Sequence, residues 1–231
     1  MTSDLEALRE RRVYFGHQSV GRNILDGLAA MAPQADLAFL TESEIGENGN
    51  PQSKCDDFAR HVEGLDGHID IALMKFCYID FDQNSDVEQI FGHYSQTIDR
   101  LQQRYPQIRF VHVTAPLKTS PSGLKTLVKK LLGRTNTAAL QANLKRCQFN
   151  NLLRKKYQGQ PIFDLAALQS TDRHGRQHAF TLGSQTGFSM VHDYTSDGGH
   201  LNQAGSQMAA RALVRTLAAA MRSRTEAGAR Q

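Results

Sequence analysis

Short apolar runs alternate with amphipathic segments along almost the whole chain, and this alternation constrains the fold more than any other feature. The clearest run, residues 69–78, is nearly continuous and apolar, as expected of a strand that is covered on both faces. Strands alternating with helices form a mainly parallel sheet, so we predict an α/β fold, a flavodoxin-like three-layer α/β/α sandwich. The other predicted strands are residues 13–15, 37–40, 110–117 and 161–165.

The segments between these strands show helical spacing of apolar residues. Residues 169–194 are instead rich in Gly, Ser, Thr and His, and we read them as a long loop region with room for a small hairpin. A length of 231 residues favours one domain over two, so we expect a single domain over 1–231, with frayed termini at 1–10 and 225–231. The predicted helices are residues 19–31, 58–65, 86–104, 137–157 and 203–222, the last capped by Asn202.

Composition excludes several classes of protein. A net charge of +4 is too small to indicate nucleic-acid binding, and no apolar run is long enough to span a membrane, so we expect neither partner. The three cysteines are an odd number without a C-x-x-C pair, which favours a reducing compartment over a disulfide framework. On this sequence we expect a cytoplasmic protein, or a periplasmic or secreted one if a signal peptide was removed.

Residues 12–21 predict a buried strand, a tight turn and a helix, with Ser19 at the turn. In open parallel sheets, ligands bind beyond the carboxyl ends of the strands, which is where Ser19 falls. The loop at 41–51 and residues 75–82 follow the next two strands, so they reach the same edge. Serine is also a good helix cap, and a capping role alone explains Ser19 equally well at this point.

A second polar motif, Asp197-Gly198-Gly199-His200, lies just before the last helix. A serine hydroxyl needs a base within hydrogen-bond reach to become a nucleophile, and the base needs a group that orients it. His200 is the candidate base, and Asp197 can reach its Nδ1 if the loop turns back. The two glycines allow that turn without steric cost.

The positions of Ser19 and the Asp197-x-x-His200 motif make the chain resemble the SGNH/GDSL hydrolase superfamily. The resemblance implies that Ser19 is the nucleophile, His200 the general base and Asp197 its orienter, with no cofactor and no metal. It implies cleavage of acyl or acetyl esters, on a small-molecule or carbohydrate substrate, through an acyl-enzyme. If an alcohol replaces water in the second step, the same site is an acyltransferase.

Two departures suggest a divergent branch of that superfamily. The usual Gly-Asp-Ser block is here Gly16-His17-Gln18-Ser19. The family takes oxyanion-hole donors from a glycine and an asparagine, besides the nucleophile's own amide. Gly46 and Gly49 both qualify for the glycine, and we prefer Gly49. No asparagine ends the third strand, where Lys75 is either a charged replacement donor or the partner of a structural carboxylate.

Other classes of protein share parts of this sequence pattern. The Gly-x-Ser-x-Gly elbow of α/β-hydrolases is rejected, because those folds place several strands before the nucleophile. A binding module that has lost catalysis stays open, as does an anion site in the basic segment 125–132, which a solvated helix face also explains. A metal-dependent hydrolase lacks any typical ligand spacing, although four histidines are candidate ligands. They are His17, His112, His192 and His200.

Overall fold

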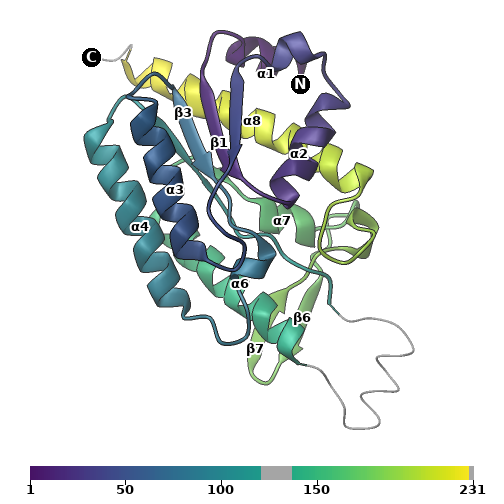
Figure 1. Ribbon diagram of the computed structural model, residues 1–231. Helices are drawn as coiled ribbons and strands as arrows, with labels where there is room; N and C mark the ends of the chain where they lie inside the picture. Colours follow the sequence, from purple (N-terminus) through teal and green to yellow (C-terminus); the bar gives the residue numbers. More distant parts are fainter. Residues whose placement is uncertain (121–136, 229–231) are drawn as a thin grey trace.

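The computed structural model describes residues 1–120 and 137–228, with side chains in the second range as far as Arg222. This part of the chain is built on a five-stranded sheet, in the order β2-β1-β3-β4-β5, in which all neighbouring strands run parallel. Helices cover both of its faces, which confirms the predicted α/β/α sandwich (Figure 1). The strands are β1 (Val13–His17), β2 (Leu40–Glu44), β3 (Ile71–Met74), β4 (Arg109–Val113) and β5 (Ile162–Phe163).

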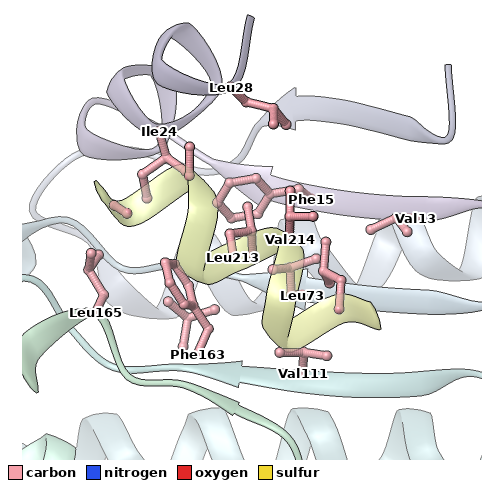
Figure 2. Close-up of a cluster of buried hydrophobic side chains, with 14 of the residues drawn as sticks. Val13, Phe15, Ile24, Leu28, Leu73, Val111, Phe163, Leu165, Leu213 and Val214 are labelled. Carbon is pink, nitrogen blue, oxygen red and sulfur yellow. The ribbon is translucent and has the colours of Figure 1, made fainter. Parts of the chain in front are cut away.

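One face of the sheet packs against helices from both ends of the chain. Alternate strand residues point to opposite faces, and Phe15 of β1, Leu73 of β3 and Val111 of β4 all point to this one. Figure 2 shows them packed against Ile24 and Leu213 from the covering helices. The helices of this cluster are α1 (Thr2–Leu8), α2 (Val20–Ala29), α7 (Leu165–Ser170) and α8 (Gln203–Gly228).

The opposite face buries a second cluster, to which the intervening strand residues belong. Tyr14 of β1 and Ala72 and Met74 of β3 pack there. Three helices cover them, so the central strands are apolar on both sides, as their sequence predicts. These helices are α3 (Pro51–Gly64), α4 (Val87–Arg104) and α6 (Ala138–Lys156).

Several helices begin at a side-chain cap that follows a strand or loop. The Asn50 side chain accepts a hydrogen bond from Ser53 N at 3.0 Å, and Pro51 takes the first position of α3. Asn202 accepts from Gly205 N at 3.0 Å at the start of α8, as predicted. The remaining elements are the hairpin of β6 (Ala179–Leu182) and β7 (Gln185–Phe188) and the short 3-10 helices η1 (Gln34–Leu37), η2 (Tyr78–Asp80) and η3 (His192–Tyr194).

The predicted second strand at 37–40 is wrong in position. Residues 34–37 form η1, and β2 begins only at Leu40 and runs through polar residues. β2 lies at an edge of the sheet and pairs only with β1, so none of its residues is fully buried and its sequence is not apolar. The loop region predicted at 169–194 does contain the hairpin, but its first residues belong to α7.

The prediction for the termini also needs correction. Residues 2–8 form α1, and Leu5 and Leu8 are buried against the core that α8 shares, so 1–10 is not a frayed end. α8 continues to Gly228, beyond the predicted end at residue 222. The basic segment 125–132 lies outside the described residues.

Candidate active site

Ser19 lies at the carboxyl end of β1 and directly before α2. Its backbone has φ 54° and ψ −107°, a left-handed conformation that is uncommon for a residue other than glycine. It occupies the N-cap position, yet its side chain makes no capping hydrogen bond. The turn therefore directs the hydroxyl away from the helix, and capping does not explain the serine.

The Asp197 carboxylate orients His200. Asp197 Oδ2 lies 2.6 Å from His200 Nδ1, and Oδ1 accepts from the backbone amides of Gly199 and His200, both at 2.8 Å. The hydrogen bond from His200, followed by those from the two amides, lowers the pKa of Asp197 well below its usual range. Gly198 has φ +84°, so the tight turn uses the freedom that glycine provides.

His200 Nε2 lies 2.8 Å from Ser19 Oγ, although the two residues are 181 positions apart. A carboxylate only accepts hydrogen bonds, so Nδ1 carries the proton and Nε2 is the free acceptor. The serine hydroxyl therefore donates to Nε2. The side chains of His200 and Asp197 are 43% and 55% exposed, so a substrate can reach this group from solvent.

Packing of α2 against α8 brings Ser19, which precedes α2, close to His200, which precedes α8. Leu201, directly after His200, donates its backbone N–H to the Asn23 side chain in α2 at 3.1 Å. Sequence reasoning missed Asn23, because nothing in its helical context distinguishes it from a surface residue.

The predicted oxyanion-hole role of Gly49 does not fit this structure. Its N–H donates to Asp80 Oδ1 at 2.9 Å, so the amide is already used. The alternative glycine, Gly46, is occupied in the same way by Asp57 Oδ2 at 2.7 Å. Both amides fix the loop after β2 and leave no donor for a substrate.

Lys75 does not fit an oxyanion role either. The residue is completely buried, and its Nζ donates to the Phe76 carbonyl at 2.9 Å with Cys77 Sγ 3.6 Å away. Burial lowers the pKa of its amine. No carboxylate in the described part of the chain forms an ion pair with it, so the alternative of a structural ion pair is not found either.

A different lysine, Lys54, forms the buried ion pair next to the site. Its Nζ donates to both oxygens of Asp80, at 2.9 and 2.7 Å, and both side chains are inaccessible to solvent. Asp80 also accepts from the amides of Gly49 and Cys77. This one carboxylate therefore joins α3, the loop after β2 and the loop after β3. Sequence reasoning missed Lys54, which sits within an amphipathic helix.

Tyr78, the first residue of η2 after β3, also reaches His200, and sequence reasoning missed it. Its hydroxyl oxygen lies 3.3 Å from His200 Nε2, and the two rings meet edge to face with centroids 5.4 Å apart. The sequence feature that could have identified Tyr78 is its position after the third strand, at the same edge of the sheet as Ser19.

The histidines considered as metal ligands lie in separate places. His17 is buried with Nε2 3.0 Å from Glu42 Oε2, and burial lowers its pKa to about 4. His112 is stacked on Tyr157 inside the second cluster, His192 lies in η3, and His200 faces Ser19. Within the described ranges, no three His, Cys, Asp or Glu residues are grouped so that they could hold a metal ion. In the same ranges, no helix is both long and apolar enough to cross a membrane.

A protein-family model described as GDSL-like Lipase/Acylhydrolase matches residues 49–213, a span that includes Asp197 and His200 and begins after Ser19. No curated protein gives a significant match.

Solved structures resemble the whole fold at low sequence identity. A protein assigned as a platelet activating factor from Streptococcus pneumonia is 16% identical with a TM-score of 0.55, covering 94% of this chain and 90% of its own. A protein assigned to the lipolytic G-D-S-L family from Desulfitobacterium hafniense DCB-2 is 9% identical, with a TM-score of 0.53 and coverage of 90% and 99%. The periplasmic domain of a lipopolysaccharide acetyltransferase from Salmonella ser. Paratyphi A is 12% identical, with a TM-score of 0.52 and coverage of 94% and 88%.

Proposed function

The chain belongs to the GDSL-like lipase/acylhydrolase family, and on that basis we propose that it cleaves carboxylic esters with Ser19 as the nucleophile. The observation that carries this proposal is the continuous hydrogen-bonded series from Asp197 through His200 to Ser19, with distances of 2.6 and 2.8 Å. A nucleophile, a base and an orienter within hydrogen-bond distance are the arrangement that activates a serine.

In the first half of the reaction, Ser19 Oγ attacks the ester carbonyl carbon and its proton passes to His200 Nε2. Asp197 stabilises the imidazolium that forms. When the tetrahedral intermediate collapses, the bond to the leaving oxygen breaks and His200 protonates that oxygen, which leaves as an alcohol. The acyl group then remains on Ser19.

In the second half, His200 takes a proton from water, and the resulting attack on the acyl-enzyme releases a carboxylic acid and restores Ser19. In this proposal the Ser19 N–H, at the start of α2, is a backbone donor to the oxyanion. We propose small acyl esters as substrates, including O-acetyl groups on carbohydrates. No step in this scheme uses a cofactor.

Labelling with a fluorophosphonate probe tests the proposal without knowledge of the natural substrate. We expect the wild type to be labelled on Ser19, located by peptide mass spectrometry, and Ser19→Ala to lose labelling. Hydrolysis of p-nitrophenyl acetate should fall by at least roughly 10³-fold in the same variant.

Ser85→Ala is the matched control, because it removes a half-buried serine hydroxyl whose hydrogen bonds in the described residues are with Asp82. It should be labelled like the wild type. A folded wild type that neither reacts with the probe nor hydrolyses the ester would contradict the proposal and favour a binding module. Labelling at another serine would reject Ser19 as the nucleophile.

A further inference from the structure

The structure leaves the oxyanion short of donors. The Gly46 and Gly49 amides donate to carboxylates, and Lys75 is buried against the Phe76 carbonyl. Of the donors expected from the sequence, only the Ser19 amide makes no hydrogen bond within the described residues. One amide is a sparse environment for a full negative charge, so a second donor near Ser19 would stabilise the oxyanion further.

The Tyr78 hydroxyl is that group by position. It lies 3.3 Å from His200 Nε2, the atom that also contacts Ser19 Oγ at 2.8 Å. Nε2 is a single acceptor in the resting state, so the two hydroxyls share it, the serine at the shorter distance. The phenol therefore contacts the atom that would take the serine proton, and its hydrogen bond to that atom is the longer of the two.

The surroundings of Tyr78 hold it in this position. Arg146 is buried and donates twice to the Tyr78 carbonyl, from Nε at 3.0 Å and from an Nη at 2.7 Å. The ring packs against Gly199, where a Cβ atom would come within 3.0 Å of the ring carbons. Arg146 therefore fixes the backbone of Tyr78, and the absence of a side chain at Gly199 leaves space for the Tyr78 ring.

The phenol is also suited to donate a hydrogen bond. Burial, the largest effect, raises the pKa of Tyr78, so the hydroxyl keeps its proton at neutral pH. The Lys118 ammonium lies 4.9 Å from the centroid of the ring. A cation over the ring draws electron density from the phenol and makes its O–H a stronger donor.

We propose that Tyr78 is a further catalytic residue, whose hydroxyl donates a hydrogen bond to the oxyanion of the tetrahedral intermediate. This assignment rests on the proposed function. When the Ser19 Oγ–carbon bond forms, the π electron pair of the carbonyl moves to its oxygen and the serine proton moves to His200 Nε2. Nε2 then ceases to be an acceptor, so the phenol is released from it and turns to the oxyanion. The phenol proton stays on Tyr78 throughout.

Tyr78→Phe removes the hydroxyl and keeps the ring that packs on Gly199 and His200. We expect kcat for p-nitrophenyl acetate to fall by roughly 10- to 10³-fold, as for loss of one oxyanion donor, with KM within about twofold of the wild type. Phenylboronic acid forms a tetrahedral adduct with an activated serine, and its affinity should fall together with kcat. A residue that only packs against the site would not change kcat and boronate affinity together at constant KM.

Tyr194→Phe is the matched control, since it removes a phenol hydroxyl that donates to the Thr171 carbonyl, outside the triad. Its kcat should equal that of the wild type. If the wild type is active and Tyr78→Phe keeps kcat within twofold, the Tyr78 assignment alone is overturned. If the wild type neither reacts with a fluorophosphonate nor hydrolyses the ester, the proposed function fails and the assignment fails with it.

Discussion

At the residue scale, Asp197 uses its two oxygens for different tasks. Oδ2 accepts a hydrogen bond from His200 Nδ1, which is the contact that the proposed mechanism uses. Oδ1 accepts hydrogen bonds from two backbone amides and holds the turn. The two tasks can therefore be separated by one substitution that keeps one oxygen.

Asp197→Asn should keep the fold and lose the activity. The amide oxygen can replace Oδ1, while the amide nitrogen, a donor, faces Nδ1 and favours the tautomer with its proton on Nε2. That tautomer cannot accept the serine proton, so we expect kcat to fall about 10⁴-fold with little change in melting temperature. Asp193→Asn, in the neighbouring η3, is the control. Activity of Asp197→Asn within tenfold of the wild type would show that Asp197 does not orient the base.

The sequence was sufficient to single out the three residues of the proposed triad, which the structure brings together, but not the residues around them. Ser19, Asp197 and His200 occur in local patterns, a strand followed by a turn and an Asp-x-x-His before a helix. Lys54 and Tyr78 reach the site through contacts between loops that follow different strands. Gly49 and Lys75 were assigned by position along the chain, which does not reveal that Asp80 and the Phe76 carbonyl take their donors.

At the element scale, close packing of α2 on α8 brings Ser19 close to His200. Gly27 in α2 touches the backbone of α8, and a Cβ atom there would come within 2.4 Å of the Ser206 carbonyl carbon and oxygen. The helices can approach this closely only because the position has no side chain. Ser19 precedes α2 and His200 precedes α8, so the distance between these helices sets the distance between the two residues.

Gly27→Ala should lower the free energy of unfolding by about 1–3 kcal/mol, because the methyl group must push the two helices apart. Hydrolysis and fluorophosphonate labelling should fall as well. Gly92→Ala in α4 is the matched control, since a Cβ atom there meets nothing within 4 Å. It should raise the free energy of unfolding by about 0.5–1 kcal/mol, because alanine favours the helix over glycine. Urea denaturation measures both changes, and equal effects of the two substitutions would contradict the role of Gly27.

Strands that are buried on both faces could be predicted from the sequence, whereas the edge strand and the N-terminal helix could not. Residues 71–74 of β3 are all buried, so the strand is visible as an apolar run. β2 is an edge strand with polar residues, and α1 has only two buried leucines, which is too short a pattern to show helical spacing.

At the scale of the whole molecule, both hydrophobic clusters share one sheet. Neighbouring residues of β1, Tyr14 and Phe15, enter opposite clusters, so neither face can form without the other. This arrangement supports our proposal that the chain is a single domain, and it places buried histidines in both halves of the core.

We expect acid to destabilise the protein because two buried histidines, His17 and His112, bind protons more readily in the unfolded chain. Burial lowers the pKa of His17 and of His112 to about 4, against about 6.5 in an unfolded chain. Between these values the unfolded chain binds more protons, so the free energy of unfolding falls as pH falls from about 6.5 towards 4. Each histidine contributes up to about 3 kcal/mol to this loss.

His112→Gln tests this because it removes one of the two groups. Between pH 4 and 6.5, we expect the slope of its free energy of unfolding against pH to be smaller than the wild-type slope. The difference should be up to about 1.4 kcal/mol per pH unit, which corresponds to the uptake of one proton on unfolding. His174→Gln, at an exposed position, should keep the wild-type slope. Denaturant titrations at a series of pH values give these slopes, and an unchanged slope for His112→Gln would show that His112 is not buried in its neutral form.

The separation of 181 residues between Ser19 and His200 has a consequence for the protein during synthesis. The ribosome makes the first strand and helix, with Ser19 between them, long before it translates His200, the residue that we propose activates the serine. Even after residue 200 emerges, α8 must still be completed and docked on α2 before the two meet. On the proposed mechanism, nascent intermediates therefore lack the complete triad, and esterase activity would first appear when the last helix completes the fold.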